Sequence, residues 1–275
     1  MSLFVASLNS GSNGNCYYIG NQNEAILIDA GISCRETERR LKRLGLSLRN
    51  VKAIFVTHEH ADHVYGISSI HKKFKIPLYI STRTLLKSRL KEVEAYNFKP
   101  YEPVSIGGLT IRAFPVLHDA IDPHNFIITN EKVNVGVFTD IGELTGHIIQ
   151  NFKQCHAAFL ESNYDDQLLE TGRYPIPLKN RIRGGYGHLS NVQAAKLFTE
   201  HRPPFMSHLF LGHLSRNNNS PRIVQNLFDN ISGPTEIVIA SRYKETRLFT
   251  IHAPTGSRRG SHYKGVVLPE QLKLF

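Results

Sequence analysis

The chain has 275 residues, 41% of them hydrophobic, which is enough for a buried core, and no apolar run reaches the length of about 18 residues that a membrane span needs. The three cysteines are far apart and the first residues do not resemble a signal peptide, so we expect a reduced, cytoplasmic protein. The formal net charge of +10 suits a polyanionic partner such as nucleic acid, although the same charge could simply aid solubility.

Short runs rich in β-branched and aromatic residues, each bounded by turn residues, predict strands along most of the chain. We expect strands over residues 3–8, 16–20, 24–31, 52–58, 77–81, 109–116, 125–130, 134–140, 157–162, 205–213, 236–241 and 247–251. The glycine- and asparagine-rich residues 9–15 predict a tight connection between the first two strands.

Helices are expected between these strands, over residues 33–45, 64–74, 141–151, 191–201 and 219–229. In the first helix, Ser33 and Glu36 have capping-box spacing and Gly45 marks the end. Strands that alternate with helices predict an α/β protein, built as a doubly wound sheet or as a four-layer sandwich. The lack of repeats and long linkers predicts a single domain over 1–275, with a basic mobile segment near 253–265.

The polar motif THEHADH, residues 57–63, directly follows the apolar run AIFV. His58 and His60 are two residues apart, so at the end of a strand both side chains point the same way and can reach one ion. Asp62 and His63 would then lie in the first turn of the next helix and face a second ion. Imidazole and carboxylate ligands suit Zn²⁺, Mn²⁺ or Fe²⁺, and two adjacent ions suit hydrolysis.

The competing interpretation of this motif is a polar surface loop whose histidines are coincidental. That interpretation explains a single histidine more readily than three histidines and an aspartate within six positions. Glu59 alternates away from His58 and His60, so we expect it to support the loop instead of binding metal. The other common histidine motif, H-E-x-x-H, is absent.

The THEHADH motif resembles the signature of the metallo-β-lactamase superfamily, whose members are hydrolases with a four-layer αββα sandwich. Further motifs occur in the order that this superfamily shows: LIDAG with Asp29, FPVLHDA with His118, VFTDIG with Asp140, and LFLGHLS with His213. The motifs SGSNGN, ESNYD, GRYPIPLKNRI, GHLSN and LGHLSRNNN are similar to those of the YycJ/WalJ branch. The resemblance spans nearly the whole chain and implies the αββα sandwich.

This resemblance implies two divalent ions per chain, zinc or manganese. It assigns three ligands to the first ion, three to the second and one bridging ligand: His58, His60 and His118; Asp62, His63 and His213; and Asp140. Asp29 is expected to hold the histidine loop through hydrogen bonds. His118 could instead be a strand-end histidine that bonds Asp119, and Asp140 could cap the helix that follows it.

His188 and His213 are difficult to tell apart, because each lies in a GHLS stretch. The strand before His213 favours metal binding, whereas resemblance to tRNA 3′-processing nucleases implies that His188 contacts phosphate and protonates the leaving group. A buried His188 that is satisfied by its neighbours, or an exchange of the two roles, stays open. The resemblance also implies that Asp62 orients the attacking water, and Ser12 or Asn13 could contact phosphate.

The YycJ/WalJ branch is thought to contain 5′-to-3′ DNA exonucleases tied to DNA repair. The resemblance therefore implies a phosphodiesterase that acts on nucleic acid, with DNA favoured over RNA. The basic runs 40–49, 71–75, 178–183 and 257–264 could follow a phosphate backbone or could be solvated faces. Hydrolysis of a lactone, thioester, β-lactam or cyclic phosphodiester, RNA processing, and a non-catalytic binding role are the alternatives. The sequence leaves the oligomeric state open.

Overall fold

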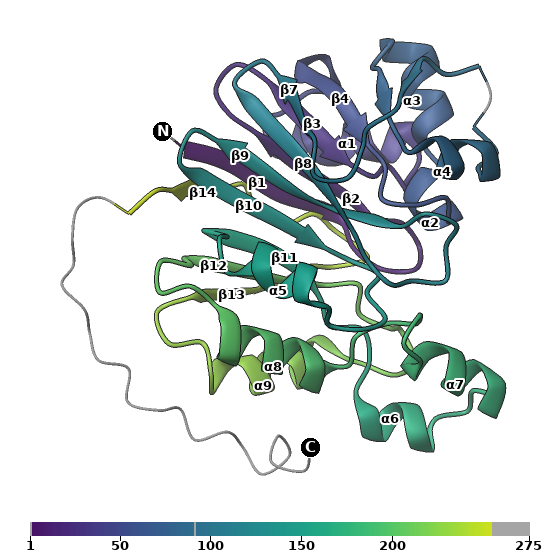
Figure 1. Ribbon diagram of the computed structural model, residues 1–275, viewed down its shortest axis with the longest axis vertical. Coiled ribbons are helices and arrows are strands. Elements are labelled where there is room, and N and C mark those ends of the chain that lie inside the picture. Colours follow the sequence, from purple (N-terminus) through teal and green to yellow (C-terminus); the bar gives the residue numbers. More distant parts are fainter. Residues whose placement is uncertain (1, 91, 255–275) are drawn as a thin grey trace.

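The computed structural model describes residues 2–90 and 92–254, in which two β-sheets pack face to face between two layers of helices (Figure 1). The first sheet has the order β14-β1-β2-β3-β4-β5-β6, with Ser2–Asn9 (β1), Cys16–Gly20 (β2), Ala25–Ile28 (β3), Val51–Phe55 (β4), Leu78–Tyr79 (β5), Ala95–Tyr96 (β6) and Phe249–His252 (β14). The second has the order β13-β12-β11-β10-β9-β8-β7, with Pro103–Ile106 (β7), Leu109–Pro115 (β8), His124–Asn130 (β9), Val133–Phe138 (β10), Ala157–Glu161 (β11), His208–Gly212 (β12) and Glu236–Ile239 (β13). The predicted αββα sandwich is confirmed.

The helices divide between the two outer faces, as Figure 1 shows. Those beside the first sheet are Cys34–Arg43 (α1), Ala61–Val64 (α2), Ile67–Phe74 (α3) and Thr82–Lys87 (α4), with the short 3₁₀ turn Leu48–Asn50 (η1) before β4. Those beneath the second sheet are Gly146–Phe152 (α5), Asn191–His201 (α8) and Pro221–Asp229 (α9). Asp166–Thr171 (α6) and Ile176–Arg183 (α7) lie apart from the sandwich, at one end of this lower layer (Figure 1).

Strand direction brings the functional loops together at one end of the sandwich. In the first sheet β1 to β3 are antiparallel and β3 to β6 are parallel; in the second, β7 to β10 are antiparallel and β10 to β13 are parallel. The loops after β1, β3, β4, β8, β10, β11 and β12 therefore leave the same edge, because their strands point the same way. β14 returns to the first sheet and pairs antiparallel with β1.

Three apolar clusters fill the spaces between the four layers. In the middle cluster, between the two sheets, the fully buried ring of Phe210 lies 4.6 Å from the Phe159 ring and 4.9 Å from the Phe249 ring, centroid to centroid. Burial of one such side chain contributes roughly 1.5–3 kcal/mol. Phe249 belongs to β14 and Phe210 to β12, so this contact ties the last strand of the first sheet to the second sheet.

Helix ends follow the predicted capping signals in α1 and α8. The Ser33 hydroxyl accepts the Glu36 N–H at 3.2 Å, and Gly45 follows α1 with a left-handed φ of 73°. At the start of α8, Ser190 and Gln193 make a reciprocal capping box. These local signals place both helices almost where the sequence predicts them.

Two helices begin at residues other than the predicted ones. The helix expected from residue 64 begins at Ala61 and breaks into α2 and α3 at Gly66, whose N–H bonds Ala30 O. A Cβ at Gly66 would overlap the Ile32 carbonyl, so only glycine allows this contact. The helix expected from residue 141 begins at Gly146, because Thr145 caps it and the preceding backbone bonds site loops instead.

Several short elements were not predicted: β6, β7, α4, α6, α7 and η1. Each is too short or too exposed to show a clear apolar period. The expected basic segment near 253–265 lies outside the described residues, apart from its first two positions. No helix in the described ranges is long and apolar enough to cross a membrane.

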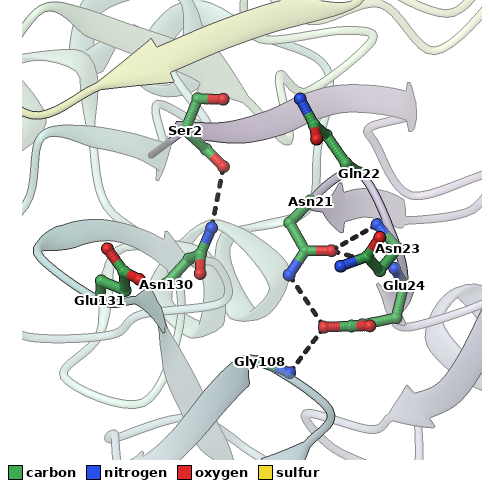
Figure 2. A pocket seen from close by; sticks show the side chains of 8 residues that line it. All are labelled: Ser2, Asn21, Gln22, Asn23, Glu24, Gly108, Asn130 and Glu131. Atoms are coloured by element: carbon green, nitrogen blue, oxygen red, sulfur yellow. Dashed lines mark hydrogen bonds between the residues drawn. The ribbon is translucent and has the colours of Figure 1, made fainter.

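A polar pocket of about 460 Å³ lies at the end of the sandwich opposite the functional loops (Figure 2). The Glu24 carboxylate accepts from Asn21 Nδ2 at 2.9 Å and from the Gly108 N–H at 2.6 Å. Asn130 Nδ2 donates to Ser2 O at 3.0 Å. The hydrogen bonds of Glu24 and Asn130 therefore join the two sheets at this end of the sandwich.

Truncation of the central aromatic ring tests the packing between the sheets. Phe210→Ala is expected to lower the free energy of unfolding by about 3–5 kcal/mol, because it leaves a cavity among Phe159 and Phe249. Leu86→Ala, on α4 and 81% exposed, is the matched control and should change it by less than about 0.5 kcal/mol. Urea denaturation followed by circular dichroism measures both, and similar losses in the two variants would contradict this packing.

Candidate metal centre

Three residues of the site leave their strands with a left-handed backbone. Asp29, Asp140 and His213 have φ values of 59°, 54° and 55° and follow β3, β10 and β12. This conformation is costly for residues other than glycine, by roughly 1–3 kcal/mol each, and persists where surrounding contacts impose it. Here it turns the chain sharply at the sheet edge, so that all three side chains belong to one cluster.

Asp29 supports the histidine loop through hydrogen bonds to Thr57 and His63. Its Oδ1 accepts the Thr57 N–H at 2.8 Å, and its Oδ2 accepts the Thr57 hydroxyl at 2.8 Å and His63 Nδ1–H at 2.7 Å. Burial raises the pKa of Asp29, and His63 and Thr57 oppose this by stabilising the carboxylate. Because His63 Nδ1 carries the donated proton, its Nε2 is left for a partner inside the site.

The loop after β1 packs against the histidine loop from the other side. Asn15 N–H donates to Asp62 O at 2.6 Å, and Asn15 Nδ2 lies 3.0 Å from His63 Nε2. Asn15 was not among the predicted site residues. Of the two predicted phosphate contacts in this loop, Ser12 lines the pocket, whereas Asn13 Nδ2 donates to Arg242 O at 3.0 Å.

Glu59 turns away from the other side chains of the THEHADH motif. Its Oε1 accepts the Ile121 N–H at 3.0 Å, so it ties the histidine loop to the loop after β8. Glu59 belongs to none of the metal-compatible groups found among the described residues. This is the supporting position expected from its place in the motif.

The structure brings all seven expected ligands together at this end of the sandwich. Four groups have ligand atoms that lie within 4.8 Å of one another: His58, His60 and His118; His58, His63 and Asp140; Asp62, His63 and His213; and Asp140, Glu161, His188 and His213. The first and third groups match the two expected sets, and Asp140 is shared between neighbouring groups.

Asp140 lies between the two histidine sets. Its Oδ2 is 3.2 Å from His63 Nε2, and its Oδ1 is 3.6 Å from His118 Nε2 and 3.3 Å from His213 Nδ1. The helix that follows is capped by Thr145, so the alternative that Asp140 is its N-cap is wrong. His118 does contact Asp119, at 3.2 Å, but its Nδ1 also bonds Gly187 O and its ring faces Asp140.

The donor atoms fit divalent metal ions. His213 Nε2 is buried without a hydrogen-bond partner, and Asp62 Oδ2, at 3.7 Å, is beyond hydrogen-bonding distance. His58 Nε2 and His60 Nδ1 face each other at 3.0 Å, as two nitrogens that share one partner would. A set of imidazoles and carboxylates without thiolates suits ions such as Zn²⁺ or Mn²⁺.

The carboxylates set the protonation of the histidines around them. Burial lowers the pKa of His213, but Asp140, Asp62 and Glu161 outweigh it and raise the pKa to about 10. Burial likewise opposes the charge of His63, yet Asp140, Asp29 and Asp62 raise its pKa well above the usual value. The surrounding carboxylates therefore favour the protonated form of both imidazoles when no metal ion is bound.

Glu161 is the site residue that the sequence analysis missed. Its Oε1 accepts from His188 Nδ1 at 2.7 Å and from His213 Nδ1 at 2.9 Å, and its Oε2 accepts the Ile141 N–H at 2.8 Å. Burial opposes the charge of Glu161, but His188 and His213 lower its pKa to about 2. Its position at the end of the buried strand AAFL was the signal available in the sequence.

His188 lies at the edge of this group, with its side chain 20% exposed, and it lines the pocket. Burial lowers its pKa, but the Glu161 carboxylate outweighs this and raises it. The bond to Glu161 uses Nδ1, so Nε2 is available to a molecule in the pocket.

The pocket above these residues has a volume of about 420 Å³. Its walls include Ser12, Ser215, Tyr174 and Arg181 of α7. Arg181 pairs with Asp119, which links α7 to the loop that carries His118. The helix α7, which stands apart from the sandwich, therefore forms part of the wall of the site.

Comparisons with known proteins agree with this geometry. A family model for the β-lactamase superfamily domain matches residues 24–213. Exodeoxyribonuclease YycJ of Bacillus anthracis is 31% identical over 82% of this chain and 87% of its own length. Exodeoxyribonuclease WalJ of Streptococcus pneumoniae is 28% identical over 77% of this chain and 81% of its own length. The solved metallo-β-lactamase fold protein YhfI of Bacillus subtilis has a TM-score of 0.70 at 16% identity, covering 90% of this chain and 99% of its own, which shows the same fold.

Metal binding is expected to release protons at pH 8. In the metal-free protein His213 has a pKa of about 10 and is protonated at this pH, whereas a metal ligand must be a neutral imidazole. Titration of chelator-stripped protein with Zn²⁺ or Mn²⁺ in weak buffer with a pH indicator measures the release. His213→Ala should release fewer protons than the natural chain, and metal uptake with no proton release would contradict the charge state described above.

Proposed function

We propose that this chain is a nuclease that uses two divalent ions to shorten DNA from its 5′ end. The chain belongs to the metallo-β-lactamase superfamily and is a metal-dependent hydrolase. The observation that carries the proposal is the pair of ligand groups on either side of Asp140. The names of the relatives, which are exodeoxyribonucleases, support a nucleic-acid substrate and favour DNA over RNA.

Each ion has a proposed ligand set. His58, His60 and His118 would hold the first ion, and Asp62, His63 and His213 the second, with Asp140 shared between them. Bound ions would polarise water and neutralise the charge that develops on the phosphoryl oxygens. The nitrogen and oxygen donors suit zinc and manganese alike.

The chain itself provides the proton chemistry in this proposal. Glu161 holds His188 through Nδ1 and favours its protonated form, so His188 can contact a phosphate oxygen and donate a proton to the leaving oxygen. Asp62 is proposed to orient the attacking water as well as to bind metal. Asp29 and Thr57 keep the histidine loop in place.

The charge of the chain fits the proposed substrate. A net charge of +10 attracts the phosphate backbone, and α7 contributes Arg181 to the wall of the pocket. The direction of cutting and a part in DNA repair rest on the resemblance to the YycJ/WalJ branch, and the proposed cytoplasmic location rests on the widely spaced cysteines. A small ester or cyclic phosphodiester is the second candidate substrate, since 420 Å³ is within the range of small-molecule sites.

The metal content of two variants should distinguish the roles of His188 and His213, the histidines of the two GHLS motifs. Purified chain refilled with Mn²⁺ or Zn²⁺ is expected to hold about two ions, His188→Ala about two, and His213→Ala about one, because only His213 is a proposed ligand. Elemental analysis measures all three. Loss of an ion from His188→Ala with retention in His213→Ala would mean that the roles are exchanged.

A nuclease assay tests the substrate. Duplex DNA labelled at the 3′ end should shorten from its 5′ end with Mn²⁺, and His188→Ala should lower kcat by about 10²–10⁴-fold with its metals retained. His147→Ala, on the helix α5 and outside the metal-compatible groups of the described residues, is the matched control and should keep full activity. Hydrolysis of lactones or cyclic phosphodiesters with no cleavage of DNA or RNA would favour the second candidate.

A further inference from the structure

Two arginines lie beside the pocket without a carboxylate to neutralise them. Arg242 Nη2 donates to Leu214 O at 2.9 Å, which is a neutral acceptor. Neither Arg216 nor Arg242 has an acidic oxygen within 4.0 Å in the part of the chain that the structure describes. Other arginines near the entrance do have one, as Arg181 has in Asp119.

Arg242 is held against the loop that carries Ser12. Gly11 has a φ of 145°, and a Cβ there would lie 2.9 Å from Arg242 Nη2, so glycine makes room for the guanidinium. Asn13 Nδ2 donates to Arg242 O at 3.0 Å, and the Ser10 N–H donates to Ser241 O at 3.2 Å. The guanidinium is therefore fixed between this loop and Leu214, next to the wall of the pocket.

Arg216 lies in a loop whose neighbouring residues are held by hydrogen bonds. Ser215 N–H donates to Asn163 O at 2.7 Å, and the buried Asn219 Nδ2 donates to Ser162 O at 2.8 Å and to Asn163 O at 3.0 Å. Arg216 itself is exposed. Arg216 therefore lies on a fixed loop, directly after the pocket-lining residue Ser215 and three residues after His213.

The two cations share one neighbourhood. Burial lowers the pKa of Arg242, and the nearby positive charge of Arg216 lowers it further. Tyr174, which lines the pocket, lies on the same side, and its hydroxyl accepts from Asn217 Nδ2 at 2.9 Å. Repulsion between like charges is relieved when an anion binds to both.

We propose that Arg216 and Arg242, together with the hydroxyl groups of Ser12 and Tyr174, bind a phosphate group of the substrate strand next to the phosphate that is cleaved. The inference rests on the proposed nuclease function. Arginine suits this role because its planar group donates several hydrogen bonds to phosphate oxygens. The bound phosphate is either the terminal phosphate of the strand or an internal diester, and both have the same anionic oxygens.

The test measures binding of single-stranded DNA to the full chain loaded with Mn²⁺. The probe is an oligonucleotide with a 3′ fluorophore and cleavage-resistant phosphorothioate linkages, and anisotropy gives Kd at several salt concentrations. Arg216→Gln and Arg242→Gln should each weaken binding about tenfold and reduce the slope of log Kd against log salt by about 0.7. Lys132→Gln, an exposed lysine in the β9–β10 turn at the opposite end, is the matched control with the same charge change.

Three forms of the probe distinguish the source of the phosphate: one with a 5′-terminal phosphate, one without it, and one with a methylphosphonate at the first linkage. If the terminal phosphate is bound, removing it should weaken binding to the natural chain but not to the arginine variants. If an internal diester is bound, a neutral methylphosphonate at the first linkage should have that effect instead. The exposed position of Arg216 makes Arg216→Gln informative even where Arg242→Gln unfolds, and a thermal melt of each variant verifies folding.

The outcomes separate this site from the nuclease activity. Unchanged Kd and salt slope in both arginine variants, or an equal loss in Lys132→Gln, would overturn the phosphate site while cleavage of unmodified DNA persists. Failure of the natural chain to cleave any nucleic acid would instead overturn the proposed function, and this site with it. Loss of affinity confined to the arginine variants supports the site.

Discussion

The negative charge gathered at one end of the sandwich is the constraint on which the rest of the site depends. Asp29, Asp62, Asp140 and Glu161 contact histidines, and none is paired with lysine or arginine among the described residues. A buried charge without a partner costs several kcal/mol, so this cluster is stable only with cations inside it. Protonated imidazoles provide these cations in the metal-free chain, and divalent ions would replace them while freeing the same nitrogens as ligands.

The fold provides the rigid frame that such a cluster needs. Strands from both sheets end at the same edge, and residues in left-handed conformation turn the chain sharply there. The expected ligands therefore lie in the loops and turns that follow these strands, and the supporting bonds of Asp29 and Glu161 fix the ring nitrogens. At the opposite end, Glu24 and Asn130 join the sheets, so that the frame is held at both ends.

The αββα sandwich was predicted from the resemblance of many motifs, since the alternation of strands and helices alone left a doubly wound sheet open. The histidine loop and two helix starts were predicted from local signals. His58, His60, Asp62 and His63 occur within six residues, and capping residues mark α1 and α8. The role of Glu161 was not predicted, because its place at the end of the strand AAFL does not reveal its partners, which are two histidines far along the chain. The helices α6 and α7 were missed because they are short and exposed and pack against loops, so their apolar residues show no period.

The pairing of β14 with β1 has a consequence for the newly made chain. Among the described strands, Ser2–Asn9 leaves the ribosome first and its outer neighbour Phe249–His252 leaves last. At about 5–20 residues per second, the edge of β1 stays open for roughly 10–50 s, during which it can pair with the wrong strand. His213 also arrives late, so the nascent chain holds the carboxylates Asp29, Asp62 and Asp140 before the second ligand set is complete. The edge of β1 is therefore open to mispairing for longer during synthesis than in a fold whose neighbouring strands emerge in order.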